Sequence, residues 1–296
     1  MLRFKHGITI LASSIAGLAA VIFAGGSLAG EAALHPPRMT VPAECPSIEG
    51  LACIPVEIAA KDGARLRAWY FQPPMRNGGA VIVLHGIGAS RAQNAAMAHL
   101  FVPLGYSVLT PDLRGHGESE GVVSYGVLEA EDIHRWADWL FRTGRVSRLY
   151  GIGESLGGSV LLRSLDCEPR FRAVIAESAY SDFPSIARER IVRMMPTGFK
   201  WLAEPVVVSG LSWTRWRYGI DLREPSPTDA VSRTHVPILL IHGLADDRTS
   251  PDNSRRLAAL NPKIQLWLVP NAGHTAAWRT APREFESRTT RWLSEH

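Results

Sequence analysis

Short apolar runs that alternate with helix-like segments limit the fold of this chain more than any other feature. The runs are 80–84, 106–110, 149–151, 173–176, 238–241 and 265–269. Such short runs are typical of strands that are buried on both faces of a sheet. Helical patterns separate them at 95–102, 125–141, 156–165, 251–260 and 282–293. This alternation predicts an α/β fold with a mostly parallel central sheet and helices on both faces.

A hairpin is expected before the parallel part, because the β-rich runs 54–61 and 65–72 flank Asp62-Gly63. The composition is that of an ordinary globular chain, with 46% hydrophobic and 20% charged residues. The net charge of +4 is spread along the sequence, so no nucleic-acid partner is expected. The three cysteines form no C-x-x-C pair, so no metal site is expected either.

The apolar segment near the start has two interpretations. Basic residues precede a run without charged side chains from Gly7 to Gly30. Its length is close to the roughly 20 residues that span a bilayer, which favours an uncleaved anchor. The small residues at 27–29 also fit a signal peptide that is cleaved before Gly30. Residues 1–30 are thus expected to be a signal anchor, which would contact the membrane through residues 7–30, or a signal peptide.

In both interpretations the basic end stays in the cytoplasm. The folded domain is then exported to the cell envelope or the periplasmic side, or secreted after cleavage. Residues 31–53 are rich in proline and are expected to be a linker to a folded domain at 54–296. Cys45 and Cys53 lie at the domain entry, in a compartment that would permit a disulfide, but their spacing alone does not show that they meet. Cys167 is expected to be a buried free thiol.

A stretch at about 183–223 interrupts the alternation of strands and helices. It contains three tryptophans and two methionines among several arginines. An insertion of this length is commonly a lid or another functional segment, and a helical pair that only covers the core is the alternative. An amphipathic lid with such residues could lie at a bilayer surface.

The five residues 153–157, Gly-Glu-Ser-Leu-Gly, follow a predicted strand and open a helical pattern. In a Gly-x-Ser-x-Gly turn the serine adopts a strained conformation, so its neighbours have to be small. Ser155 is therefore the candidate nucleophile, with Gly153 and Gly157 as the glycines of the elbow. The N–H of Leu156, at the helix start, is a candidate oxyanion donor.

Two loops further along supply a base and an acid. Asp246 follows the strand run at 238–241, and His274 follows the last one. Both are expected at the carboxyl edge of the sheet, where ligands bind in such folds. Upstream, Gly86 and Ile87 follow the run at 80–84. The glycine allows close approach of a substrate, and the Ile87 N–H is the second candidate oxyanion donor.

These motifs together resemble those of the α/β-hydrolase superfamily of serine hydrolases. The resemblance rests on His85-Gly86, Asp112 to Ser119, Gly153 to Gly157, His242 to Asp246 and Gly273-His274, and covers nearly all of 54–296. The chain is similar to the branch that contains monoacylglycerol lipases, haloperoxidase-like esterases and iminopeptidases. Its segment 220–237 resembles a membrane-anchored or exported subgroup. The loop Asp112 to Ser119 is expected to be structural.

The resemblance implies an enzyme that cleaves a carboxylic ester, of a small molecule or a lipid such as an acylglycerol. Ser155 would attack the carbonyl while His274 takes its proton, and Asp246 would orient the histidine. The two oxyanion donors named above complete the site, and no metal or cofactor is required. The alternatives are an amide or peptide bond, with Glu204 as a candidate for binding a free amine, and a non-catalytic binding protein on the same scaffold.

The identity of the acid has alternatives, because the chain departs from the family pattern after Asp246. Relatives usually carry a proline four residues after the acid, whereas this chain has Ser250 there and Pro251 one residue later. Asp247 is therefore a second candidate for the acid. Some relatives carry the acid after the preceding strand, where the candidates are Glu177 and Asp182.

Overall fold

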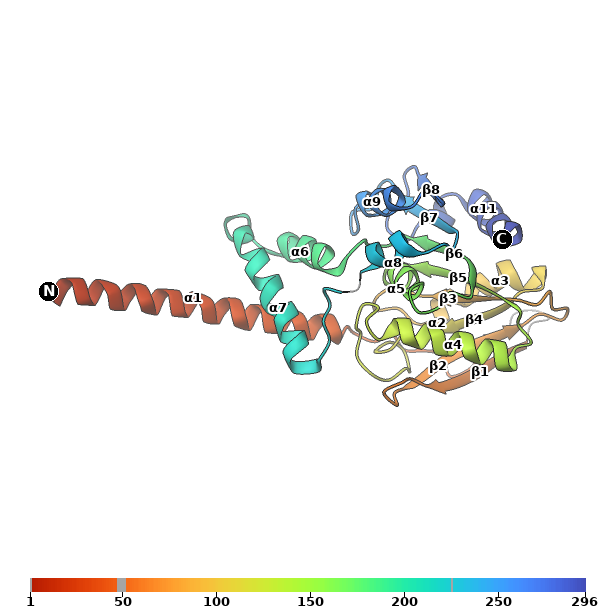
Figure 1. The fold of residues 1–296 in the computed structure, drawn as a ribbon, viewed down its shortest axis with the longest axis horizontal. Helices are drawn as coiled ribbons and strands as arrows, with labels where there is room; N and C mark the ends of the chain where they lie inside the picture. Colours follow the sequence, from red (N-terminus) through yellow and green to blue (C-terminus); the bar gives the residue numbers. More distant parts are fainter. Residues whose placement is uncertain (1, 47–51, 225) are drawn as a thin grey trace. The chain divides into compact units, whose positions relative to one another are not determined.

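The structure, a computed structural model, describes residues 2–46, 52–224 and 226–296 (Figure 1). The chain divides into two compact units. The helical unit joins the residues up to Leu34 with Phe183–Glu224. The sheet unit comprises His35–Asp182 and Pro225–His296.

The sheet unit is built on one mixed sheet, whose eight strands in the described ranges lie in the order β1-β2-β4-β3-β5-β6-β7-β8. The strands are β1 Ala52–Ala59, β2 Arg65–Gln72, β3 Gly79–Leu84, β4 Ser107–Pro111, β5 Arg148–Glu154, β6 Phe171–Glu177, β7 Ile238–Gly243 and β8 Ile264–Val269. β2 pairs antiparallel with β1 and β4, and every pairing from β4 to β8 is parallel. Each of the six apolar runs overlaps one strand from β3 to β8, so the mostly parallel sheet is confirmed. The predicted hairpin is β1–β2.

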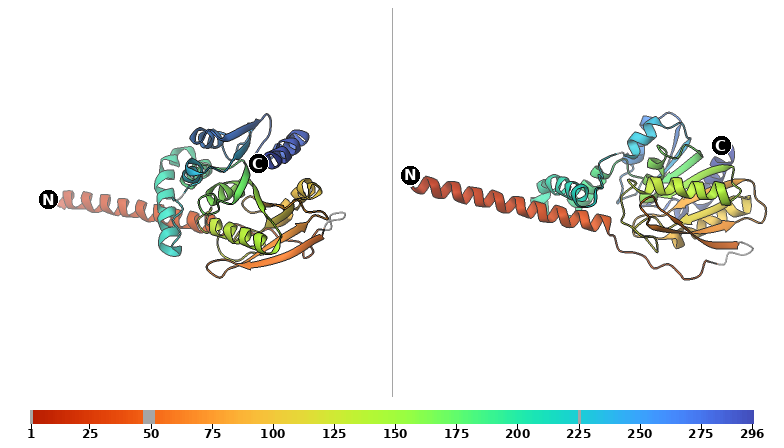
Figure 2. Two further views of the ribbon diagram at one scale, coloured as in Figure 1. Left: turned by 45° about the vertical axis from the view of Figure 1, so that its right-hand side comes forward. Right: turned by 60° about the horizontal axis from the view of Figure 1, so that its bottom comes forward.

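Helices cover both faces of this sheet (Figure 2). They are α2 Arg91–Asn94, η1 Ala95–Met97, α3 Ala98–Phe101, η2 Val102–Leu104, α4 Glu129–Thr143, α5 Leu156–Ser164, α8 Pro227–Arg233, α9 Asp252–Leu260, α10 Ala277–Thr280 and α11 Pro282–Glu295, where η denotes a 3₁₀ helix. One hydrophobic core joins Val81 and Val83 of β3 to Phe101 of α3 and Phe285 of α11. Because strand side chains alternate, Ile82 faces the opposite side. There α4, α5, α8 and α9 pack one against the next.

Two predicted helices differ in extent from the observed ones. The pattern at 95–102 forms a series of single turns between Arg91 and Leu104, which ends at the left-handed Gly105 (φ 87°). The pattern at 125–141 begins only at Glu129, because Tyr125 has a positive φ of 54°. The Glu129 carboxylate accepts hydrogen bonds from the N–H groups of Ser124 and Gly126, each at 2.7 Å, and so holds the chain that precedes the helix.

The helical unit consists of α1 (Leu2–Leu34), α6 (Phe183–Met194), η3 (Thr197–Leu202) and α7 (Ala203–Tyr218). The insertion at 183–223 is thus helical, and α7 lies across α1 (Figures 1 and 2). α1 continues four residues beyond the expected end at residue 30. Glu31 to Leu34 are good helix formers, and the helix stops just before Pro36 and Pro37. By length and composition, Ser13–Leu34 could cross a membrane, a property that signal sequences share.

Two of the three cysteines form a disulfide and the third is free. Cys45 and Cys53 form a disulfide with their Cα atoms 5.9 Å apart. Cys167 is free and partly buried, and burial raises the pKa of its thiol to about 11. The segment 31–53, which was expected to be a linker, begins within α1 and ends in β1. Its residues 47–51 lie outside the described residues.

Candidate active site

Strands β3 and β5, which are each followed by one of the predicted motifs, lie side by side where the order of strand connections reverses. From β3 the chain moves outward to β4 and then returns across β3 to β5. The loops after β3 and β5 therefore diverge, and open α/β sheets bind their ligands at such a point. Gly86 follows β3 and Ser155 follows β5, and a Cβ added to Gly86 would lie 3.5 Å from the Ser155 Cβ. Gly86 thus keeps backbone close to the serine.

The turn between β5 and α5 holds Ser155 in a strained conformation, with φ 52° and ψ −114°. The two glycines of the elbow are required by close packing. A Cβ on Gly157 would lie 2.4 Å from the Leu84 carbonyl oxygen, and a Cβ on Gly153 would lie 2.5 Å from the Gly157 backbone. The Ser155 N–H donates to the Glu177 carbonyl at 2.8 Å, which ties the elbow to the end of β6.

Ser155, His274 and Asp246 meet in a hydrogen-bonded chain. The Nε2 of His274 lies 2.8 Å from the Ser155 Oγ, and its Nδ1 lies 2.8 Å from an Asp246 carboxylate oxygen. Because a carboxylate only accepts, Nδ1 carries the proton when the ring is neutral. Nε2 is then left as an acceptor for the serine hydroxyl. The structure therefore brings together the three residues that the sequence nominated, in the arrangement by which a base activates a nucleophile.

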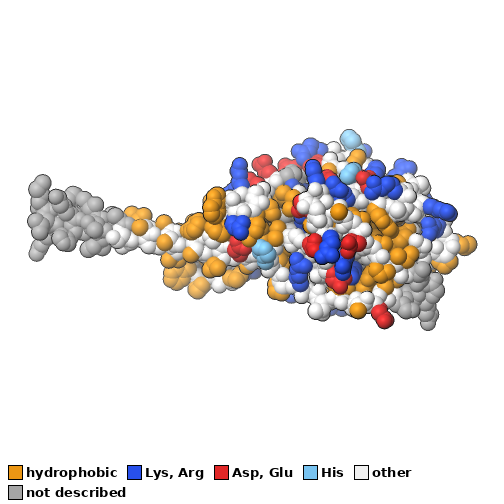
Figure 3. Space-filling model, turned by 90° about the horizontal axis from the view of Figure 1, so that it is seen from below, with side chains coloured by type: hydrophobic (Ala, Val, Ile, Leu, Met, Phe, Trp, Pro, Cys, Tyr) orange, Lys and Arg blue, Asp and Glu red, His pale blue; other side chains and the backbone are white. Residues whose placement is uncertain are grey.

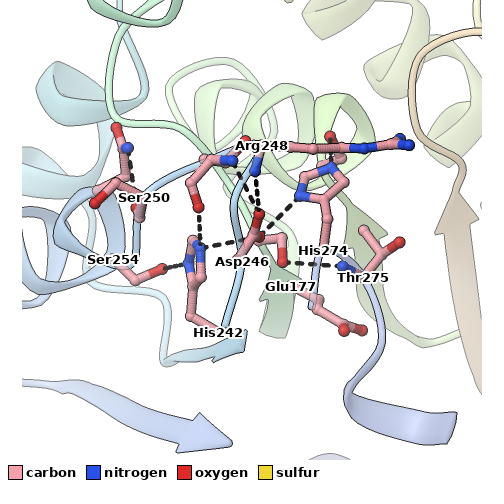
Figure 4. A network of polar contacts seen from close by, with 12 residues as sticks. Glu177, His242, Asp246, Arg248, Ser250, Ser254, His274 and Thr275 are labelled. Carbon is pink, nitrogen blue, oxygen red and sulfur yellow. Dashed lines mark hydrogen bonds and ion pairs between the residues drawn. The ribbon is translucent and has the colours of Figure 1, made fainter. Parts of the chain in front are cut away.

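Asp246 is a buried carboxylate with an unusually complete set of donors (Figure 4). One oxygen accepts the N–H groups of Arg248 and Thr249 at 3.0 and 2.9 Å, and the other faces two histidine rings. Burial alone would raise the pKa of Asp246, but the hydrogen bonds from the histidines and the backbone outweigh it and hold the pKa well below its usual range. The acid is therefore charged throughout the neutral range.

His242 is a site residue to which the sequence assigned no role. Its Nε2 lies 2.9 Å from the Thr249 carbonyl and 3.3 Å from Asp246, and its Nδ1 lies 2.7 Å from the Ser254 Oγ (Figure 4). Since a carbonyl and a carboxylate both accept, Nε2 carries the proton and Nδ1 accepts from the hydroxyl. The ring thus holds the loop Asp246 to Thr249 through one atom at each of its ends. The only sequence signal was its place four residues before Asp246.

A junction at the end of β6 connects the serine to the histidine loop. The Ala277 N–H donates to the Glu177 carboxyl at 2.9 Å, and the Thr275 N–H donates to the Ser178 Oγ at 3.2 Å (Figure 4). Burial, and then the neighbouring Glu154 charge, raise the pKa of Glu177 to about 8. Burial raises the pKa of Glu154 to about 7. The sequence did not reveal this junction, because its partners lie about a hundred residues apart.

The two expected oxyanion donors follow the ends of neighbouring strands, Ile87 after β3 and Leu156 after β5. Leu156 is the first residue of α5, so its N–H is among those without a partner inside the helix. The loop that carries Ile87 is held by His85, whose Nδ1 donates to the Gly86 carbonyl at 2.8 Å and whose Nε2 accepts the Leu113 N–H at 3.1 Å. Burial lowers the pKa of His85 to about 3, so this ring stays neutral.

The loop Asp112 to Ser119 is structural, as expected. The buried Asp112 carboxylate pairs with Arg91 and accepts the Glu118 N–H at 2.9 Å. A Cβ on Gly117 would lie 2.3 Å from the Asp112 Cγ, so only glycine fits there. This cluster fixes the chain that follows β4.

Of the candidates for the acid, Asp246 is the one that the structure places against His274 Nδ1. Asp247 is exposed, and Asp182 lies 3.4 Å from Arg256. The carboxyl of Glu177 accepts from the Ala277 N–H, as described above. In the helical unit, Glu204 forms an ion pair with Arg188 at 3.3 Å. A search of the described residues finds no group of three or more His, Cys, Asp or Glu side chains that could hold a metal ion.

Comparisons with known proteins agree with this architecture. Residues 81–288 match the model of the alpha/beta hydrolase family. An uncharacterized protein of Mycobacterium tuberculosis is 31% identical over 226 residues, which are 74% of this chain and 71% of that protein. The Arabidopsis thaliana alpha/beta hydrolase domain-containing protein WAV2 is 24% identical, over 81% of this chain and 78% of its own.

Among solved structures, the Pyrococcus furiosus esterase Pf2001 superposes with a TM-score of 0.71 at 23% identity. The match covers 88% of this chain and 99% of the esterase, and at that identity it shows the shared fold. The family match and the 31% identity to the M. tuberculosis protein show membership of a family as well as a shared fold. This chain belongs to the alpha/beta hydrolase family.

Proposed function

We propose that this protein is a serine hydrolase that cleaves carboxylic esters through an acyl-enzyme intermediate. The single observation that carries the proposal is the continuous hydrogen-bonded chain from the Ser155 Oγ through His274 to Asp246, with both links at 2.8 Å. A serine, a base and a group that orients the base are what nucleophilic acyl transfer needs.

In the proposed mechanism each group has one role. The Nε2 of His274 takes the hydroxyl proton while the Ser155 Oγ bonds to the substrate carbonyl carbon. The N–H groups of Ile87 and Leu156 bind the negative oxygen that forms. The bond to the leaving alcohol then breaks, and His274 returns the proton to the departing oxygen. Water, deprotonated by the same histidine, releases the acid and regenerates the serine.

Asp246 supports these steps by its charge. It fixes the tautomer that leaves Nε2 as the acceptor, and it stabilises the imidazolium that forms when the serine proton is taken up. The low pKa of this carboxyl, described above, ensures that the charge is present at neutral pH. His242 and the backbone donors keep the carboxylate oriented and leave no buried lone pair on it without a donor.

We infer further that the ester is lipid-like and that the sheet unit works outside the cytoplasm, anchored by α1. The disulfide between Cys45 and Cys53 suits an oxidising compartment. The apolar helix carries basic residues at its start, as an anchor with a cytoplasmic N-terminus does. The solved relative Pf2001 is an esterase, which agrees with this choice of bond. In the amide alternative Glu204 would bind the free amine, but its carboxylate is already paired with Arg188.

Covalent labelling of the purified full-length protein with a fluorophosphonate probe tests the proposed nucleophile. Labelling should be lost in Ser155→Ala and kept in the control Ser294→Ala, which changes an exposed serine at the end of α11. Equal labelling of the Ser155→Ala variant would exclude the assignment. Matched pairs of ester and amide substrates then decide the bond. The lipid assignment fails if long-chain esters are cleaved no faster in vesicles than in detergent.

A further inference from the structure

The helical unit contains a helix–helix contact that depends on the absence of side chains. A Cβ on Gly26 of α1 would lie 2.5 Å from the Ser209 Cβ of α7, and a Cβ on Gly30 would lie 3.1 Å from the Gly210 carbonyl oxygen. A Cβ on Gly210 would in turn lie 2.9 Å from the Gly26 carbonyl oxygen. Three glycines at one crossing let two helix backbones approach as closely as they do in membrane helix pairs.

Polar and aromatic contacts extend this crossing along α1. Glu31 accepts hydrogen bonds from the Trp213 Nε1 at 2.7 Å and from the Tyr218 hydroxyl at 2.6 Å. On the other side of the glycines, the Phe23 and Trp213 rings meet edge to face at 5.9 Å. The insertion is therefore fastened to α1 over the whole segment from Phe23 to Glu31.

This contact bears on whether α1 is retained. Cleavage before Gly30 would remove Phe23 and Gly26, and would leave the close-packed face of α7 without its partner. α1 also continues as one helix through the small residues 27–29. A segment that is removed during export has no reason to carry half of such a contact. The contact therefore favours an anchor that remains part of the mature protein.

Both α1 and the insertion also expose large apolar side chains (Figure 3). Among the side chains whose burial is described, those more than half exposed are Ile15, Val21, Phe23 and Leu28 on α1, and Met194, Phe199, Trp201 and Trp216 on the insertion. Soluble surfaces rarely expose so many together, and tryptophan is typical of the boundary between lipid and water. The segment Phe183–Glu224 also carries seven Lys and Arg against four Asp and Glu. That excess of positive charge suits an anionic lipid surface.

Where the crossing lies depends on where the span begins, and we take its start as the first residue after the basic side chains. About 20 residues span the hydrocarbon core, so a span that begins after the basic start, at Gly7, ends close to Gly26. The glycine crossing then lies at the outer surface of the bilayer, and Glu31 lies just beyond the lipid tails. Trp213 and Tyr218, which donate to Glu31, would occupy the aromatic zone of the interface.

We propose that α1 and the insertion form a permanent lipid-binding unit, in which α1 is retained and docks α7 at the outer leaflet. The apolar tip of the insertion, defined as Met194, Phe199 and Trp201, enters that leaflet. This inference rests on the proposed export of the sheet unit. It assigns a lipid surface as the partner of the insertion. In this proposal α1 is a structural part of the lipid-binding unit as well as its anchor.

The test uses the full-length chain in vesicles of phosphatidylcholine and phosphatidylglycerol that contain nitroxide-labelled lipid. A fluorophore is attached to cysteine in Gly198→Cys, at a position beside the tip where an added Cβ meets nothing within 4 Å. Ser294→Cys provides the control in the sheet unit. The native cysteines do not interfere, because two form a disulfide and the pKa of Cys167 is raised to about 11.

We expect the intact mass of the protein to include α1. We also expect the nitroxide lipid to quench the probe at 198 strongly and the probe at 294 weakly. Gly26→Leu, combined with the probe at 198, should reduce quenching to the level of the probe at 294. Gly17→Leu, where an added Cβ also meets nothing within 4 Å, should leave it unchanged. A mass that begins at Gly30, equal quenching at the two probe positions, or unchanged quenching in Gly26→Leu would overturn the proposal.

Fluorophosphonate labelling of each variant keeps this test separate from the proposed function. Labelling that persists in Gly26→Leu shows that the sheet unit is folded, so a loss of quenching then reports on the helical unit alone. If the probe at 198 is quenched but no protein is labelled, the lipid-binding unit stands and the proposed chemistry fails.

Discussion

Burial of Glu177 should make the sheet unit less stable as the pH rises. Burial, and then the nearby Glu154 charge, raise the pKa of Glu177 from 4.5 in the unfolded chain to about 8. The folded state therefore binds this proton more tightly than the unfolded state does. The stability is fully present below the unfolded pKa and falls as the pH rises towards the folded pKa. At about 1.36 kcal/mol for each pKa unit, Glu177 alone accounts for a loss of about 4 kcal/mol between pH 5 and 9.

Denaturant unfolding of the full-length protein in detergent, followed by tryptophan fluorescence at pH 5, 7 and 9, measures this loss. Glu177→Gln keeps an acceptor for the Ala277 N–H but cannot ionise, so its loss across this range should be smaller than that of the wild type by about 4 kcal/mol. The remaining slope includes a loss from Glu154 and Asp132, whose pKa values burial raises to about 7 and about 6, and an opposite contribution from His85, whose pKa burial lowers to about 3. The control Glu284→Gln, at an exposed position in α11, should follow the wild type. The same pH slope in Glu177→Gln as in the wild type would refute the reasoning.

Three further predictions follow from individual contacts. Asp246→Asn should lower kcat on a short soluble ester by about a thousand- to ten-thousand-fold, because the histidine loses its orienting charge, whereas Asp247→Asn should stay close to wild type. Gly117→Ala should lower the free energy of unfolding by about 3 kcal/mol or more, since its Cβ would clash with Asp112 at a positive φ; an unchanged Tm would contradict this. Iodoacetamide at neutral pH should leave Cys167 unmodified in the folded protein and modify it after unfolding, because burial raises its pKa to about 11.

Those parts of the molecule that depend on local pattern were predictable from the sequence. The strands β3 and β7 are buried along their whole length, so each appears as an apolar run. The elbow is equally local, because Gly153 and Gly157 pack within a few residues of the serine and against the end of β3. Helix boundaries were less predictable. The start of α4 depends on a carboxylate of Glu129 that reaches back to the preceding loop, and α8 depends on a capping box that begins at Ser226.

The grouping of Ser155, His274 and Asp246 was predictable because all three follow strands whose ends share one edge of the sheet. The contacts that hold them in place were not. Ser254 holds His242, which in turn contacts Asp246. Glu177 meets Ala277 only when β6 and the histidine loop lie side by side. Sequence spacing carries no trace of such pairings, because the partners are chosen by the sheet order.

Sequence patterns were enough to predict the fold class, the candidate nucleophile, base and acid, and an apolar helix near the start. All of these follow from periodicity or from short motifs, in which neighbouring residues constrain one another directly. Three pairings became visible only in the folded chain: Asp246 faces His274, Cys45 meets Cys53, and α7 packs on the glycines of α1. Those outcomes depend on distances between segments far apart in the chain, and such distances are set by how the whole chain packs.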